Sequence, residues 1–409
     1  MKSKQIISID ASLLQAKQEA QQENWSEVVY YLQNSPIFAT KSSFSQTDNQ
    51  EQELAVELAL ATLIKGEFQQ KWDIAKVFPF MEVKIIAPLI TLIEDAAIDT
   101  ETKWFAARSL GNFSEQTVVI ALAQLIQNTQ DSDLVAIAAK SLVNIGNPAI
   151  EVLIALAKKP ESRLIAAKSL AHIRLAPALP TLLELVKDNN PEIRLLAIEA
   201  LGSFHQPEIP PVLIEALKDT HSKVRKEAVI ALGFCPDLCS TLNLVECLQP
   251  LLYDLNPDVS RQTALSLARM NHPRAVKALN EALESQYSSL DLKFNLIKAL
   301  AWSNLNSALH CLQDAIKKED ESIRREIIIA LGRIRKPELK PQAFTILEEF
   351  WYSFSSNELD FESKKALATA LGELKAIEGK DILLQLSGDR EKIVRLYAVS
   401  SLKKLFPKN

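Results

Sequence analysis

The chain has 409 residues, of which 47% are hydrophobic and 24% charged, so it can bury a large core and is too apolar to be disordered. Its formal net charge of −5 argues against a protein that coats nucleic acid, which needs a summed positive field. Nine glycines favour helices over strands, and four cysteines are too few for a disulfide scaffold. Without a signal peptide or an apolar run of membrane-spanning length, we expect a cytoplasmic protein with no membrane span.

Residues 1–82 do not follow the pattern of the rest and are predicted to form an atypical helical cap. Residues 11–33 are typical of a helix or a helical pair, residues 38–51 of a polar loop, and residues 53–65 and 69–78 of further helices. Terminal repeats of a solenoid are commonly atypical because they close an open core. A partner-binding module is the alternative interpretation of this segment.

From residue 83 to residue 409 the chain repeats a helical pattern of about 31 residues. The alignment is anchored on ten leucines: Leu110, Leu142, Leu170, Leu201, Leu232, Leu267, Leu300, Leu331, Leu371 and Leu402. The residue before each leucine is Ser or Ala, as close helix packing requires, and five of the leucines are followed by Gly. We expect these glycines to end helices with positive φ. Apolar residues four and eight positions before the leucine share its helix face, and each repeat is predicted to be a helix, an acidic turn and a second helix.

The pattern D-x-x-x-x-V-R-x-x-A-x-x-A-L-G at residues 219–233 resembles a HEAT repeat. It is most similar to the short subtype in the E/F-type phycobilin lyases of cyanobacteria and in related phycobilisome-degradation proteins. The resemblance covers about residues 83–405 and implies an all-α fold, a right-handed α-solenoid of about ten hairpins. The family has no single catalytic motif that transfers to residues of this chain.

A column of cations stands seven positions before the aligned leucines. Eight of the ten repeats carry one: Lys103, Arg163, Arg194, Arg225, Lys293, Arg324, Lys364 and Arg395. Aspartates stand thirteen positions before four of the leucines, at Asp188, Asp219, Asp254 and Asp389. We expect the cations to pair with these acids of their own or a neighbouring repeat, although such a ladder could also bind phosphates or carboxylates.

A second stripe lies two and six positions before the leucines and is expected to line the concave face. It carries the candidate binding residues Trp104, Arg108, Lys140, Lys168, Arg261, Phe294, Lys298 and Arg325. Cations mixed with aromatics suit a flat, conjugated anion, such as an open-chain tetrapyrrole with two propionates, or an acidic protein surface. A solvated basic helix face is the alternative.

The spacing from Leu331 to Leu371 is 40 residues, about nine more than usual. The surplus is rich in aromatics, and Phe350 and Phe354 are expected in the core. We expect Trp351 and Tyr352 to face another way and to form a docking patch for a partner.

The cysteines and histidines have no metal-ligand spacing and form no catalytic triad, so neither a metal site nor a required cofactor is predicted. Two functions stay open. The resemblance implies a phycobilin lyase-like protein, with a phycobilin as ligand or substrate and a phycobiliprotein subunit or a second HEAT-repeat chain as partner. The alternative is a non-enzymatic scaffold that binds another protein. The sequence leaves open whether the chain is an enzyme.

Overall fold

The computed structural model describes residues 10–40, 42–353 and 359–406, and this part of the chain is helical, without a β-strand. It is an α-solenoid, as the repeat pattern predicts. The chain divides into two compact units, Met1–Ala200 and Leu201–Asn409. This division does not test the predicted boundary between the N-terminal cap and the repeats at residue 82, which stays a prediction.

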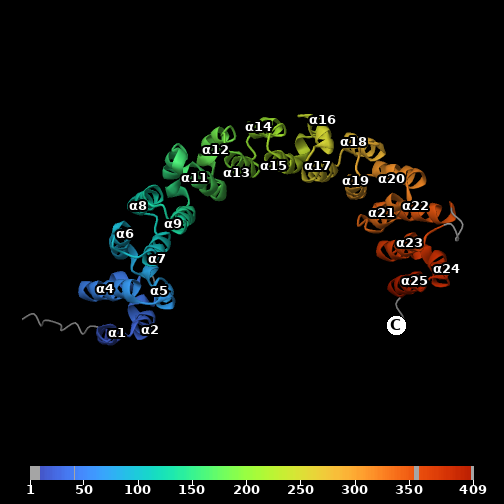
Figure 1. Cartoon of the computed structure of the whole chain (residues 1–409). Coiled ribbons are helices and arrows are strands. Elements are labelled where there is room, and N and C mark those ends of the chain that lie inside the picture. Colours follow the sequence, from blue (N-terminus) through green and yellow to red (C-terminus); the bar gives the residue numbers. More distant parts are fainter. Residues whose placement is uncertain (1–9, 41, 354–358, 407–409) are drawn as a thin grey trace, which may run out of the picture. The chain divides into compact units, whose positions relative to one another are not determined.

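The first unit begins with helices outside the repeat alignment and continues with hairpins (Figure 1). Its helices are α1 (Ala11–Gln21), α2 (Trp25–Gln33), α3 (Ser43–Gln46), α4 (Asn49–Lys65), α5 (Phe68–Ile74), α6 (Ile86–Glu94), α7 (Thr100–Leu110), α8 (Gln116–Asn128), α9 (Ser132–Ile145), α10 (Ile150–Ala157), α11 (Pro160–Ile173), α12 (Leu179–Leu185) and α13 (Pro191–Leu201). The short helix α3 interrupts the predicted loop because Phe44 is buried and stacks on Phe38.

The second unit consists of hairpins. Its helices are α14 (Ile209–Ala216), α15 (Ser222–Gly233), α16 (Leu244–Leu248), α17 (Pro257–Arg269), α18 (Pro273–Glu284), α19 (Leu290–Trp302), α20 (Asn306–Lys318), α21 (Glu321–Gly332), α22 (Lys340–Ser353), α23 (Phe361–Leu374), α24 (Lys380–Ser387) and α25 (Lys392–Leu405). Figure 1 shows that within each unit the first helices of the hairpins form one row and the second helices another. We call the side of the second-helix row that is turned away from the first helices the second-helix face.

The ten aligned leucines all lie on second helices, and nine of them are buried. Leu402 is half-buried, since no described helix packs beyond α25. The sequence register is therefore confirmed, and the contact that repeats along each unit is a leucine inserted between successive hairpins.

The glycines after these leucines have a different role from the one expected. Gly111 has φ −62°, and in the described chain the glycine with positive φ is Gly146, which follows no aligned leucine. A Cβ atom added at Gly332 would lie 2.5 Å from Cα of Ala370, and one at Gly111 would lie 2.9 Å from Cβ of Ser141. The expectation of positive φ is wrong. Glycine is needed because the small residue of the next repeat occupies the place of its side chain.

The cation column ties successive repeats together, as predicted. Four pairs reach from one repeat to the acidic turn of the next: Arg163–Asp188 at 3.2 Å, Arg225–Asp254 at 2.7 Å, Lys293–Glu319 at 3.0 Å and Lys364–Asp389 at 2.9 Å. Arg225 also donates from Nη1 to the carbonyl oxygen of Asp219 in its own repeat, at 2.8 Å. These cations are engaged in holding the repeats together.

Helix α22 takes up part of the surplus between Leu331 and Leu371, since it has 14 residues against 13 in α20 and 8 in α24. Phe350 is buried as expected, whereas Phe354 lies outside the described residues. Trp351 is only 6% exposed, so the expectation that it faces away from the core is wrong. Trp351 borders a hollow that Leu359 and Phe361 also line.

Candidate partner-binding face

The residues of the predicted stripe are exposed or half-buried on second helices of both units. In the first unit, Arg108 on α7 and Trp104 beside it are half-buried, whereas Lys140 on α9 and Lys168 on α11 are exposed. Helices α7, α9 and α11 pack side by side in this order. The first-unit stripe therefore forms one continuous part of the second-helix face.

Arg108 is held by two tryptophans. Its guanidinium carbon lies 3.9 Å from the centroid of the Trp72 ring and 5.8 Å from that of Trp104. Both indoles contact the edge of Phe105, which is fully buried, with centroid distances of 6.3 Å and 5.2 Å. A guanidinium stacked on indole keeps its charge and its outward-facing donors. The arrangement fixes a cation at the surface without neutralising it.

Two open hollows adjoin these cations and share Asn144. The first, of about 270 Å³, is lined by Trp72, Ala75, Lys76, Pro79, Arg108, Ser109, Asn112 and Asn144. The second, of about 310 Å³, is lined by Ala136, Ala139, Lys140, Val143, Asn144, Ile165, Lys168, Ser169 and His172. No carboxylate is among these lining residues. The cations of both hollows therefore lie beside apolar and neutral polar side chains, and the second hollow is largely apolar.

In the described part of the chain, no carboxylate lies within 4 Å of Arg108, Lys140 or Lys168, whereas the stripe cations of the second unit have acidic partners. There Arg261 lies 3.3 Å from Asp258 and 3.8 Å from Asp291. Lys298 lies 3.3 Å from Glu326, and Arg325 lies 3.4 Å from Asp360. Phe294 is half-buried beside them on α19. The structure thus brings together the first-unit residues of the stripe as free cations and places the second-unit residues in ion pairs.

The docking patch expected at residues 351 and 352 is reduced to one exposed side chain. Tyr352 is 63% exposed, while Trp351 is buried. Partner contact by Tyr352 stays a prediction.

The described residues contain no cluster of three or more His, Cys, Asp or Glu side chains that could hold a metal ion. All four cysteines are free thiols. Burial raises the pKa of Cys235, Cys239 and Cys311 above the ordinary value of 9.0, which disfavours their thiolates. No helix in the described part of the chain combines the length and apolarity needed to cross a bilayer.

Sequence reasoning missed Trp72, Asn144 and His172 on this face. Trp72 lies in α5, which precedes the aligned repeats, so the repeat register could not place it. Asn144 and His172 both stand two positions after an aligned leucine. Aligning the residues two positions after each leucine, as was done for the stripe, would have identified Asn144 and His172 from the sequence.

The profile of HEAT repeats matches residues 86–171, 158–233, 209–291 and 244–332. Among solved structures, importin beta is 12% identical with a TM-score of 0.52, covering 97% of this chain and 64% of its own. Kap121p bound to Nup53p is 14% identical with a TM-score of 0.51, covering 96% and 52%. The chain thus spans between half and two thirds of the length of these two proteins, and at these identities the likeness shows the fold alone.

The complex of CpcE and CpcF of phycocyanin lyase from Nostoc sp. PCC7120 is 21% identical, covers 56% of this chain and 92% of its own, and has a TM-score of 0.31. That TM-score is too low to relate the two structures. No curated protein sequence matches the chain.

Proposed function

Because the chain belongs to the HEAT-repeat family, we propose that it is a binding scaffold whose first unit holds an acidic protein partner on its second-helix face. The observation that supports this proposal is the set of free cations on successive helices, Arg108, Lys140 and Lys168, without a carboxylate of the described chain within 4 Å.

Free cations on a helix face are available to a partner, since they need not first give up an intramolecular ion pair. Each exposed pair formed with a partner contributes roughly 0.2–1 kcal/mol. Three such pairs amount to a change in affinity of roughly threefold to a hundredfold. Trp72 and Trp104 add rigid aromatic contact area beside Arg108, which is the residue composition that dominates binding energy at protein interfaces.

A second candidate ligand is an open-chain tetrapyrrole, as in a phycobilin lyase-like protein that serves a phycobiliprotein subunit. The stacked Arg108 and Trp72 border a hollow, and Lys140 and Lys168 border the next one, which would suit a conjugated plane with two propionates. The raised pKa of Cys235, Cys239 and Cys311 disfavours thioether formation on these three thiols. The pigment would then be held for transfer to another protein.

The test compares two matched triple variants. Arg108→Glu/Lys140→Glu/Lys168→Glu removes the free cations, and Arg261→Glu/Lys298→Glu/Arg325→Glu removes the paired ones. A fluorescein-labelled oligoglutamate peptide serves as the acidic probe, and carbodiimide cross-linking with mass spectrometry locates it on Lys140 and Lys168. We expect the first variant to weaken binding about tenfold and the second to change it little.

Equal loss in both variants, or cross-links that avoid Lys140 and Lys168, would contradict the proposal. The tetrapyrrole candidate is tested separately by adding a phycobilin to the protein and recording the visible spectrum. A shifted and sharpened band that the first triple variant abolishes supports this ligand, and an unchanged spectrum removes it.

A further inference from the structure

The second unit contains another basic hollow, which shares Lys298 with the ion-paired part of its stripe. It has a volume of about 350 Å³ and is lined by Lys298, Ala301, Trp302, Asn304, Ala330, Arg333, Ile334 and Arg335. These residues come from the ends of α19 and α21 and from the segments that follow them. The lining contains three cations, an indole and three apolar side chains, and no carboxylate.

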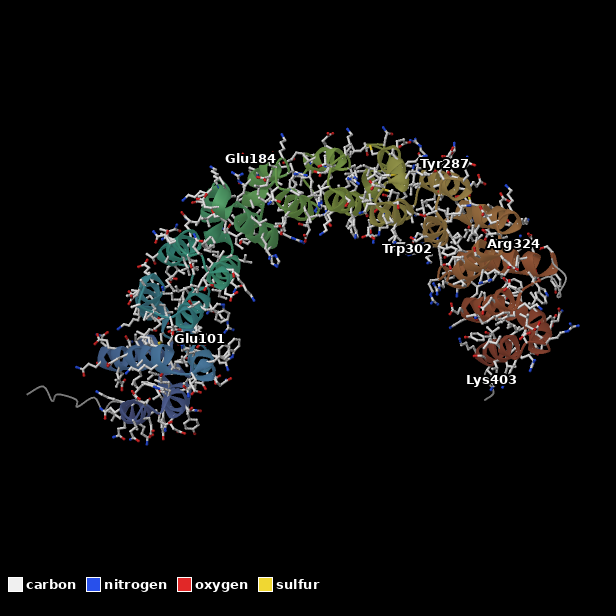
Figure 2. The ribbon with its side chains drawn as sticks, in the orientation of Figure 1. Glu101, Glu184, Tyr287, Trp302, Arg324 and Lys403 are labelled. Carbon is white, nitrogen blue, oxygen red and sulfur yellow. The ribbon has the colours of Figure 1, made fainter. Side chains whose placement is uncertain are left out.

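Trp302 is the largest side chain of this hollow and is 51% exposed. It projects from the second-helix row, whereas Tyr287 lies on the side of the first helices (Figure 2). An exposed indole that borders a hollow offers a rigid stacking surface at little entropic cost, which is typical of the anchor positions of protein interfaces.

Trp302 belongs to a row that crosses three second helices. Phe234, Arg269 and Trp302 each stand two positions after an aligned leucine, at the ends of α15, α17 and α19. The guanidinium carbon of Arg269 lies 4.5 Å from the centroid of the Phe234 ring and 5.6 Å from that of Trp302. Phe234 is 65% exposed. In this row the Arg269 guanidinium lies between the rings of Phe234 and Trp302, and both rings are exposed to solvent.

Two observations indicate that this surface lacks an acidic partner. Arg333 and Arg335 are exposed, and in the described residues no carboxylate lies within 4 Å of either guanidinium. In addition, Nη1 of Arg269 is buried and has no hydrogen-bond acceptor in the structure. In the described residues Arg269 has no ion pair either, so it adds a third positive charge without an acid beside it.

We infer that this hollow and the adjoining row, Phe234, Arg269, Trp302, Arg333 and Arg335, form a second docking site, which takes an acidic peptide segment with an aromatic side chain. The aromatic ring of the peptide stacks on Trp302 inside the hollow, against Ala301, Ala330 and Ile334. Its neighbouring carboxylates accept hydrogen bonds from the planar guanidinium groups of Arg333 and Arg335, a geometry that favours bidentate pairing. Charge complementarity selects this occupant, since every free charge at the site is positive.

This site is independent of the proposed function, because it lies in the other unit and uses none of the three free cations of the first. The bland alternative is a solvated loop whose charges serve solubility. That alternative explains Arg333 and Arg335 but gives no reason for the two exposed rings that flank Arg269.

The experiment measures binding by fluorescence anisotropy on the full chain with four probes. The first is a fluorescein-labelled peptide of three Glu-Glu-Phe repeats. The others are a Glu-Glu-Ser peptide that lacks the ring, a Gln-Gln-Phe peptide that lacks the charge, and an oligothymidine that offers stacking with phosphates. We expect the Glu-Glu-Phe peptide to bind at least tenfold more tightly than each of the others.

Four variants locate the binding. Trp302→Ser and Arg333→Ser/Arg335→Ser are each expected to weaken binding of the Glu-Glu-Phe peptide about tenfold, whereas Trp302→Phe keeps the ring and retains most of the affinity. Tyr287→Ser, which removes an aromatic that is 83% exposed elsewhere in the unit, is the matched control and leaves binding unchanged. Circular dichroism and thermal melting show whether each variant is folded.

Three results would overturn the inference. One is equal binding of the peptides with and without Phe, which would reduce the site to a basic patch. Another is tighter binding of oligothymidine, which would identify a nucleic-acid surface. The third is the loss of peptide binding in the Arg108→Glu/Lys140→Glu/Lys168→Glu variant but not in Trp302→Ser, which would place the peptide on the first unit.

Discussion

The second-helix faces of the two units carry cations of the same stripe, but the surroundings of these cations differ. The first-unit cations stand two positions before the aligned leucines, and those of the second unit stand two or six positions before them. On the first unit, Arg108, Lys140 and Lys168 have no carboxylate of the described chain within 4 Å. On the second, Arg261 and Lys298 are paired with acids of the following repeats, at 3.8 Å and 3.3 Å. The same stripe therefore connects repeats in the second unit and presents an open set of charges in the first. Lys140 and Lys298 stand at the same position, two before the leucine, and differ in whether the next second helix offers an acid. Lys298 has Glu326 at 3.3 Å, whereas Lys140 has no carboxylate within 4 Å in the described residues.

The largest expected effect is the loss of stability on breaking the buried ion pair between Arg225 and Asp254, which joins two repeats of the second unit. Arg225→Ala leaves Asp254, whose side chain is only 7% exposed, without its guanidinium partner at 2.7 Å. Removing one partner of a buried pair costs about 3–5 kcal/mol, and we expect a loss near the lower end because Arg225 is 17% exposed. Lys140→Ala, which removes a free cation, should change the free energy of unfolding by less than about 0.5 kcal/mol. Urea denaturation measures both, and similar losses would remove the distinction between connecting and free cations.

The next effect concerns the glycine that both units place against a small residue of the following repeat. Gly111→Ala in the first and Gly332→Ala in the second each insert a Cβ atom into the space of the next repeat's Ser141 or Ala370. Overpacking of this kind costs about 1–3 kcal/mol. Gly388→Ala is the control, since its Cβ atom would be 3.5 Å from the nearest atom, an ordinary contact. Thermal melting should separate the three, and a stable Gly332→Ala variant would show that the close approach is not needed.

A smaller effect separates the two faces by their stability. Reversing the charges of Arg261, Lys298 and Arg325 to Glu places each new carboxylate beside an existing acid. Exposed pairs contribute roughly 0.2–1 kcal/mol each, so the three reversals together should cost about 1–3 kcal/mol. The matching reversal of Arg108, Lys140 and Lys168 should leave the melting temperature nearly unchanged. A lower melting temperature for the first-unit variant than for the second-unit variant would contradict the absence of acidic partners for Arg108, Lys140 and Lys168.

The smallest effect is a difference in acid sensitivity. Burial tends to raise the pKa of Asp254, but hydrogen bonds from Arg225 and the Asn256 amide outweigh it and hold this pKa below 3.8. Burial likewise opposes a lowered pKa at Asp360 and Asp389, where hydrogen bonds from Ser363, and from the Glu391 amide and Lys364, prevail. Among the described residues, the carboxyls of the second unit with a lowered pKa include Glu246, Asp254, Asp320, Glu349, Asp360 and Asp389. The first unit has two, Asp73 and Asp99.

A carboxyl with a lowered pKa stabilises the fold fully above its unfolded pKa and loses this contribution as the pH falls through its folded pKa. Below a pH of about 4, the second unit should therefore lose more stability than the first. Pepsin cleavage over this range, with the sites identified by mass spectrometry, should begin in the second unit. First cleavage within the hairpins α6 to α13 would contradict this expectation.

The fold was predictable because each repeat encodes its own core. Leucine, the small residue before it and the apolar positions four and eight earlier are local features, so one register places all ten second helices. The meaning of Gly111 and Gly332 was not predictable in this way, because it depends on a residue about thirty positions later. The burial of Trp351 was missed for a related reason, since nine surplus residues fit a longer helix as well as an outer loop.

The candidate site was predictable only in part. Arg108, Lys140 and Lys168 follow from the register, because positions two before a buried leucine point away from the core. Whether these cations are free depends on the acids of neighbouring helices. Only the three-dimensional structure therefore distinguishes Arg108, which has no acidic partner in the described residues, from Arg325, which is paired with Asp360. Trp72 could not be found from the repeat, yet it contacts Arg108 more closely than Trp104 does.

The contact between each glycine and the small residue of the next repeat also bears on how such a gene can grow. Duplication of one complete repeat recreates the same junction on both sides of the copy, with a glycine facing Ser or Ala. A duplication that starts within a helix would instead set two ordinary side chains against each other where there is no space for them. Whole-repeat insertions and deletions are thus the changes of length that the chain tolerates at little cost, and homologous chains should differ in length by multiples of one repeat.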